Sequence, residues 1–179
     1  MKRILVLLLL LATALSLTSC AIRQRKTEDE GEYEEYLARV EYADVYMPTL
    51  ALCGEYSAFC ATYKYRFVVM FETYTVGLFL SYGEDEYEAQ KAAVLSRYEF
   101  FDAEDETLVS DPDATAGGYH FRLVKQDYPL ETYKVGLLIG TDDADRRICY
   151  LYYYDCDLDV LDNLDVYIRE HAYLPQCLP

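Results

Sequence analysis

Five cationic residues in an otherwise acidic chain are the best candidates for binding chemistry. They fall in segments where the residue pattern predicts β-strands, and a strand places every second side chain on the same face of a sheet. Several of these cations could therefore line one face, among tyrosines, and bind a small anionic ligand or an acidic partner protein. The competing interpretation is ion pairing with neighbouring Asp and Glu. The candidates are Lys64, Arg66, His120, Arg122 and Lys134, with Arg147 on a further predicted strand.

The sequence contains no recognisable catalytic motif. His120 and His171 are the only imidazoles, and neither has a nucleophile at the spacing of a known hydrolase motif. Gly117 and Gly118 lack the Lys-Ser/Thr that completes a phosphate-binding loop. We therefore expect structural or surface histidines, no cofactor and no enzymatic activity.

Asp155, Asp157 and Asp159 alternate as ligands do at the start of an EF-hand loop. The pattern then fails, because Val160 stands where the loop needs Gly and Val166 where it needs a bidentate Glu. We interpret these aspartates as structural and expect no metal site. With 32 Asp and Glu in the chain, some pair could still reach the spacing of glycosidase carboxylates. A small cell-envelope hydrolase is therefore the alternative function.

The cysteines leave two arrangements open. Five follow Cys20, and because the count is odd at least one thiol stays unpaired. A strand would hold Cys149 and Cys156 roughly 24 Å apart, too far for a disulfide, whereas Cys53 and Cys60 could close a small loop. No C-x-x-C motif is present, and buried free thiols are favoured over a disulfide framework. The five cysteines are Cys53, Cys60, Cys149, Cys156 and Cys177.

The first twenty residues have the pattern of a secretory signal. Lys2 and Arg3 precede an apolar run from residue 4 to residue 17. As a helix this run would measure about 21 Å, too short for a hydrocarbon core of about 30 Å. A basic start, a short apolar core and small residues before the cleavage site are typical of a signal peptide.

The end of this signal, Leu17-Thr18-Ser19-Cys20, resembles the lipobox of bacterial lipoproteins. In that family a peptidase cleaves just before the cysteine, which carries a diacylglyceryl thioether. The resemblance implies that residues 1–19 are a signal peptide and that Cys20 is the lipidation site. It also implies a location on the extracytoplasmic side of a bacterial cell membrane, with the membrane bound through this lipid.

The charge of the mature chain excludes one class of partner. Residues 1–19 hold two basic and no acidic residues, so 14 basic residues then face 32 acidic ones, a net charge of −18. Nucleic acid is therefore excluded as a partner, because its phosphates require a basic surface. Membrane attachment should likewise depend on the acyl chains. We expect residues 20–31 to be the lipidated cysteine and a tether, and residues 32–179 to form one domain.

The residue patterns predict an α+β domain. Short connections favour antiparallel neighbours, so we expect a mainly antiparallel sheet of about five strands with helices packed on one face. The clearest helix carries apolar residues at Tyr87, Val94, Leu95, Tyr98 and Phe101. In chain order, α-ββ-α-βββ-α, we predict a helix over 32–46, strands over 58–71 and 74–82, a helix over 84–101, strands over 119–125, 133–140 and 147–155, and a helix over 161–171.

Parts of the domain resemble small uncharacterised Firmicutes-type proteins. The resemblance lies in Met47-Pro48-Thr49-Leu50, in Gly54 and Tyr56, and in Tyr152-Tyr153-Tyr154-Asp155. It implies the same order of elements, and that group has no assigned activity.

These observations predict a membrane-anchored, non-enzymatic binding or interaction module. Its partner would be a protein or a small anionic ligand. The absence of Trp weakens the hydrolase alternative, because Trp is a common platform for sugars. A mature chain of 160 residues is also too short for the two lobes of a solute receptor.

Overall fold

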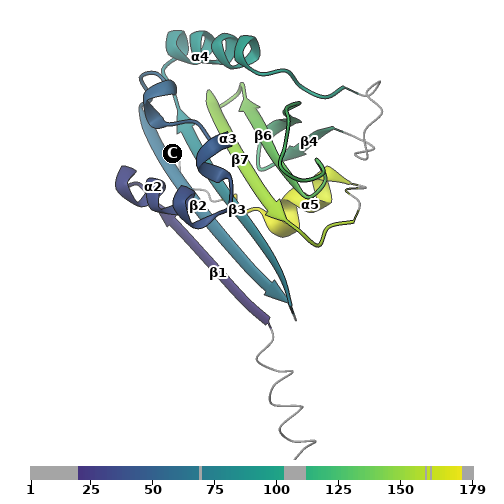
Figure 1. Ribbon diagram of the computed structural model, residues 1–179. Helices are drawn as coiled ribbons and strands as arrows, with labels where there is room; N and C mark the ends of the chain where they lie inside the picture. The colour runs from purple at the N-terminus through teal and green to yellow at the C-terminus, as the bar shows by residue number, and fades with distance from the viewer. Residues whose placement is uncertain (1–19, 69, 103–111, 160, 162, 175–179) are drawn as a thin grey trace, which may run out of the picture.

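The protein folds around one open antiparallel sheet of seven strands in the order β1-β2-β3-β7-β6-β5-β4 (Figure 1). The computed structural model describes residues 20–174 except 69, 103–111, 160 and 162. The α+β prediction is confirmed. The strands are β1 (Cys20–Thr27), β2 (Ala58–Val68), β3 (Phe71–Ser81), β4 (Asp113–Ala116), β5 (Tyr119–Leu123), β6 (Val135–Asp142) and β7 (Arg147–Asp155); the helices are α2 (Glu30–Arg39), α3 (Ala43–Tyr46), α4 (Glu84–Arg97) and α5 (Leu164–His171), with a 3₁₀ turn, η1 (Leu50–Leu52).

The first strand corrects the prediction of a tether. β1 pairs with β2 along its whole length, from Cys20 opposite Val68 to Thr27 opposite Ala61. The segment is polar, and its exposed Arg23 and Arg25 give no apolar periodicity. Its pairing therefore comes from backbone hydrogen bonds to the long strand β2, and charged side chains are typical of such an edge. Residues 20–27, which the prediction assigned to the tether, are therefore part of the sheet.

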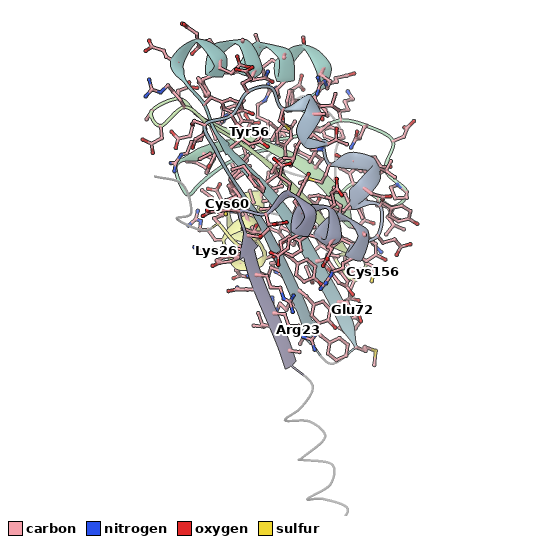
Figure 2. The ribbon with its side chains drawn as sticks, turned by 90° about the vertical axis from the view of Figure 1, so that its left-hand side faces the viewer. Arg23, Lys26, Tyr56, Cys60, Glu72 and Cys156 are labelled. Atoms are coloured by element: carbon pink, nitrogen blue, oxygen red, sulfur yellow. The ribbon has the colours of Figure 1, made fainter. Side chains whose placement is uncertain are left out.

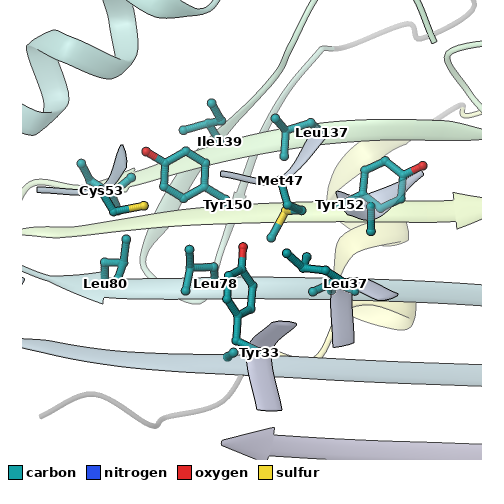
Figure 3. Packing of buried hydrophobic residues seen from close by; sticks show 14 of the residues in the cluster. Tyr33, Leu37, Met47, Cys53, Leu78, Leu80, Leu137, Ile139, Tyr150 and Tyr152 are labelled. Carbon is teal, nitrogen blue, oxygen red and sulfur yellow. The ribbon is translucent and has the colours of Figure 1, made fainter. Parts of the chain in front are cut away.

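The prediction that all helices pack on one face is wrong. α2, α3, η1 and α4 contribute to a core on one face of the sheet, and α5 packs on the opposite face. The apolar run of β7 explains this arrangement, because a strand buried on both faces has no polar side. Figure 3 shows the first core, which includes Tyr33, Leu37, Met47, Cys53, Leu78, Leu80, Leu137, Ile139, Tyr150 and Tyr152. The second includes Phe79, Phe121, Leu138, Cys149, Leu151, Tyr153, Leu164, Tyr167 and Ile168.

Tyrosine hydroxyls tie the irregular segments to the first core. Tyr33 donates to the carbonyl of Pro48 at 2.7 Å, Tyr82 to that of Cys53 at 2.9 Å, and Tyr152 to that of Glu41 at 3.1 Å. A tyrosine buries a large apolar ring and still satisfies a loop carbonyl that would otherwise lose its hydrogen bond to water. In this core, the tyrosines therefore both fill the interior and satisfy the backbone of the loops that cover it.

Helix α4 lies at one end of the sheet, and the hairpin between β2 and β3 lies at the other (Figure 1). Tyr87 and Val94 of the predicted apolar stripe are buried, whereas Leu95 is exposed. The helix ends at Arg97, and Phe100 then pairs with Val124 in an isolated bridge. In the described part of the chain, no helix has the length and hydropathy needed to span a membrane.

Candidate functional site

The five predicted cations do not share a surface. Lys64 and Arg66 lie on the face of the sheet that α5 covers, and His120 and Arg122 lie on the opposite face. Lys134 lies in the turn before β6, and its ammonium group is 5.8 Å from the centre of the Tyr133 ring. The single binding face expected from the sequence is therefore wrong, and the cations divide into separate groups.

Lys64 caps the end of α5. Its Nζ donates to the carbonyl oxygen of Glu170 at 2.5 Å and lies 3.4 Å from that of Ala172. The neighbouring hydroxyls of Thr62 and Thr75 donate to the carbonyls of Tyr173 and His171. The last carbonyls of a helix lack partners within the helix and carry partial negative charge. Burial lowers the pKa of Lys64, and so does the nearby Arg66. We assign Lys64 a structural role.

Arg66 belongs to a buried polar cluster beside this cap. Its Nη1 lies 3.4 Å from Nε2 of His171, whose ring stacks on Tyr167 with the centroids 4.4 Å apart. The Tyr167 hydroxyl donates in turn to Asp155 at 3.4 Å. Because a guanidinium can only donate, His171 accepts through Nε2 and is neutral. Burial raises the pKa of Asp155. Arg66 and Asp155 also line a pocket of about 250 Å³.

The neutral His171 predicts a loss of stability in mild acid. Burial lowers its pKa to about 4, with Arg66 and Lys64 acting in the same direction and Glu170 opposing them. The unfolded chain binds this proton near pH 6.5, so the free energy of unfolding should fall as the pH drops from about 6.5 towards 4. Allowing for solvent screening at the partly exposed ring, we expect a loss of about 1 kcal/mol at pH 5.

Urea unfolding at pH 7.5 and pH 5 measures this loss in the free energy of unfolding. Asp155, with its raised pKa, contributes in the opposite sense, so the comparison needs a matched variant. The His171→Phe variant keeps a ring against Tyr167 and lacks the titrating group. Its stability should fall less between the two pH values than that of the parent protein. An equal fall in both proteins would contradict the assignment of this acid sensitivity to His171.

A hollow with several polar side chains in its walls lies on the opposite face, beside α4. It is open to solvent and has a volume of about 660 Å³. His120 and Arg122 reach it from β5, and Lys91 and Leu95 reach it from α4. We call this hollow the distal groove. Its lining also includes Gly118, Thr141, Asp142, Asp143 and Ala144.

The aspartates of the distal groove are already engaged. Asp143 accepts from Lys91 at 2.5 Å and from the hydroxyl of Tyr87, and these two hydrogen bonds lower its pKa. Asp142 accepts from Arg147 at 2.6 Å and from the backbone N–H groups of Ala144 and Asp145. Asp142 therefore holds the β6–β7 turn in place, and Asp143 ties that turn to α4.

Arg122 and His120 of the groove are less tightly held than Lys91. Arg122 and His120 each lie 3.7 Å from a carboxylate oxygen of Asp113 on β4. The Arg122 guanidinium also lies over the Phe100 ring, 4.3 Å from its centre. Side-chain exposure is 53% for His120 and 35% for Arg122. The Arg122 guanidinium, oriented by the Phe100 ring and a long ion pair, retains N–H donors for an incoming anionic group, and a ring N–H of His120 can add another.

Sequence reasoning found His120 and Arg122 and missed the rest of the groove. Lys91 and Leu95 come from a helix whose apolar stripe indicated only packing. Asp142 and Asp143 were part of the predicted hairpin turn, and their chemistry emerges only when α4 lies beside that turn. No group of three or more His, Cys, Asp or Glu in the described residues could hold a metal ion.

The described cysteines include both free thiols and a disulfide-bonded residue, the two arrangements that the sequence left open. Cys53 and Cys149 are buried free thiols, and Cys156 is an exposed free thiol. Cys60 is disulfide-bonded and Cys53 is free, so the small loop that these two could have closed is not formed. Burial raises the pKa of Cys53 to about 12 and that of Cys149 well above its usual value.

The difference in exposure between Cys156 and the two buried thiols predicts selective alkylation. Iodoacetamide reacts with an accessible thiolate, so the folded protein should be modified at Cys156 and spared at Cys53 and Cys149. Peptide mass spectrometry after brief treatment at pH 8 measures each site. The same protein in urea is the control, and there all three thiols should react. Modification of Cys53 in the folded protein at the rate of Cys156 would contradict its burial.

Comparison with known proteins gives no relative from which a role could be transferred. No protein-family model, curated protein or solved structure matches the chain. The distal groove, the polar cluster at α5 and the position of Cys20 are therefore interpreted from their own geometry.

Proposed function

We propose that the protein is a lipoprotein, anchored through Cys20 to the extracytoplasmic side of a bacterial membrane, that works as a non-enzymatic binding module. The observation that carries the proposal is the separation of anchor and groove. Cys20 lies opposite Val68 at one end of the sheet, and the distal groove lies at the other end, where Ser81 pairs with Arg147. Ten residues of β3 separate the two ends, a length of roughly 33 Å. A protein anchored at Cys20 would hold its groove away from the bilayer.

The state of Cys60 supports the proposed compartment. Disulfides form and persist in oxidising environments outside the cytoplasm, and Cys60 is disulfide-bonded. Together with the lipobox, this favours an extracytoplasmic location.

The ligand that suits the groove is an anionic group on a small molecule or on an acidic protein segment. Lys91, Arg122 and the imidazole of His120 border it, and His120 and Arg122 are partly exposed. The protein as a whole is strongly acidic, so attraction to an anionic ligand must be local and should weaken with salt.

The hydrolase alternative has less support. A general acid needs a raised pKa, and the pKa of Asp143 in the groove is lowered. Asp155 does have a raised pKa, but it is buried against Tyr167 and its neighbour Asp157 is exposed. Both carboxylates line the pocket of about 250 Å³ that also contains Arg66, and Asp155 is engaged there by the Tyr167 hydroxyl.

Site-specific photocrosslinking in cells tests the binding role. A benzophenone amino acid at Leu95, an exposed position in the groove, should capture a ligand-bearing partner. The same probe at Val45, which is exposed on α3, is the control. The adduct at Leu95 should decrease when His120 and Arg122 are both replaced by Gln. Equal capture at Leu95 and Val45, unaffected by that replacement, would contradict a role for the groove.

A further inference from the structure

Exposed apolar side chains gather at the end of the sheet that begins with Cys20. Among the described residues, seven large apolar side chains are exposed, and three of them lie at this end: Ile22, Met70 and Phe71, with exposures of 63%, 71% and 44%. The other four, on α3, η1, α4 and α5, are scattered singly. An isolated exposed apolar residue is ordinary, whereas a group at one tip of a protein indicates an interaction site.

The strand register places these residues side by side. Val68 pairs with Phe71 across the β2–β3 hairpin and with Cys20 across the β1–β2 pair. Ile22 pairs with Arg66, two residues further along the same face. We call Ile22, Val68, Met70 and Phe71 the apolar tip. Its side chains and the candidate lipidation residue therefore occupy the same end of three adjacent strands (Figure 1).

The apolar tip also projects beyond the rest of the sheet. β7 pairs with β3 only from Thr73 onwards, so the hairpin extends past β7 by two residues, or about 7 Å. This length matches the depth of about 5–10 Å to which apolar groups enter the interface of a bilayer. An aromatic residue such as Phe71 is suited to that depth.

The edge strand beside the apolar tip carries basic side chains, unlike most of this acidic protein. Residues 21–26 contain Arg23, Arg25 and Lys26 and no acidic residue, and all three side chains are exposed on the edge strand. Figure 2 shows Arg23 near the lower end of β1 and Lys26 further along the strand. Acidic residues also lie near the tip: Asp155 and Asp157 line a hollow with Val68 and Phe71. Glu41 and Glu72 line another with Met70. Arg23 lies about 10 Å along the strand from Cys20, within reach of the potential at an anionic membrane.

We propose that the apolar tip is a membrane-docking surface that inserts into the interface of an anionic phospholipid bilayer, with Arg23 and Arg25 facing the headgroups. The inference rests on the lipid anchor proposed at Cys20. Because residue 20 is already part of β1, no flexible tether separates the lipid from the fold. The lipid and the hairpin then enter the membrane together and fix the orientation of the domain, with the distal groove directed away from the surface.

A tryptophan placed in the tip measures this insertion directly. The chain contains no Trp, so Phe71→Trp introduces the only indole, at a site that is already aromatic and exposed. The full-length variant, processed in a lipoprotein-producing bacterium, is reconstituted into vesicles of phosphatidylcholine and phosphatidylglycerol. We expect a shift of its emission to shorter wavelength, quenching by brominated acyl chains and protection from aqueous iodide. Leu95→Trp, exposed at the opposite end, is the matched control and should show the reverse pattern.

Two results would overturn the inference. If Trp at 71 is quenched by iodide as strongly as Trp at 95 in lipidated, vesicle-bound protein, the tip does not insert. If quenching by brominated lipid is the same with and without phosphatidylglycerol, the role given to Arg23 and Arg25 is wrong.

Mass spectrometry of the same preparations separates this inference from the proposed anchor. A mature chain without a diacylglyceryl group on Cys20 refutes the anchor. The emission and quenching measurements are then repeated on that unlipidated protein, mixed with the same vesicles, and test whether the tip inserts without an anchor. Quenching of Trp at 71 by brominated lipid would still support docking.

Discussion

Replacing Cys20 with serine is expected to remove the protein from the membrane fraction. Serine cannot form the thioether that carries the diacylglyceryl group, and no helix in the described residues could span a membrane in its place. Each buried CH₂ of an acyl chain contributes about 0.8 kcal/mol, so two chains anchor a protein far more strongly than a small apolar surface can. We expect almost all of the variant to be either released or retained as an uncleaved precursor. Cell fractionation with intact-mass analysis distinguishes these two forms.

Cys156→Ser is the matched control for this experiment. Cys156 is an exposed free thiol that lies far from the lipobox in sequence, so its replacement should leave the protein in the membrane fraction. A Cys20→Ser protein that is cut to the mature length and still sediments with membranes would contradict the lipoprotein assignment. Weak, salt-sensitive association of released protein with anionic vesicles would remain compatible with the apolar tip.

The elements predicted well from the sequence are those with strong internal patterns. β2 and β3 alternate aromatic or β-branched residues with others, and β7 is a continuous apolar run, so each pattern indicates a strand whatever its neighbours. The turn between β2 and β3 was placed too late, at residues 72–73, because Phe71 continues the apolar alternation of β2. The structure has Val68 opposite Phe71, with the turn between them.

The two strands missing from the prediction have no such pattern. β1 has the sequence CAIRQRKT and β4 the sequence DATA. Both are edge strands, at opposite ends of the strand order. An edge strand is stabilised mainly by hydrogen bonds to its one neighbour, and a sequence does not encode that backbone pairing in its side chains. The tether was therefore inferred from polarity, which fits an edge strand equally well.

The candidate site could not be assembled from alternation alone. Alternation shows that Lys64 and Arg66 share a face, and that His120 and Arg122 share a face. Whether the two pairs share the same face depends on the register of every strand pair between them. Followed through β3, β7 and β6, that register puts the even-numbered residues of β5 on one face of the sheet and the even-numbered residues of β2 on the other face. Because helices cover both faces of the sheet, the alternation of apolar and polar residues in the sequence could not show whether the two pairs share a face.

Replacing Val94 with aspartate is expected to cause the largest loss of stability among these substitutions. Val94 is only 2% exposed and belongs to the first core, on the side of α4 that also buries Tyr87. The substitution would remove apolar contacts and place a carboxylate in an apolar core that evolved to hold a valine. We expect a loss of about 3 kcal/mol in the free energy of unfolding. For a domain of this size, that corresponds to a fall of roughly 6–12 °C in Tm.

Leu95→Asp provides a control at the next residue of the same helix. It adds the same charge, and its helix propensity cost is slightly larger because Leu is a better helix former than Val. Leu95 is 48% exposed, however, so the carboxylate stays hydrated. Its Tm should change by no more than a few degrees, since surface substitutions usually alter stability by about 0.5 kcal/mol or less. Thermal unfolding of the two variants and the parent protein, followed by circular dichroism, measures both effects. A Tm for Val94→Asp equal to that of Leu95→Asp would show that α4 does not bury this side chain, and the helical wall of the distal groove would then lose its support.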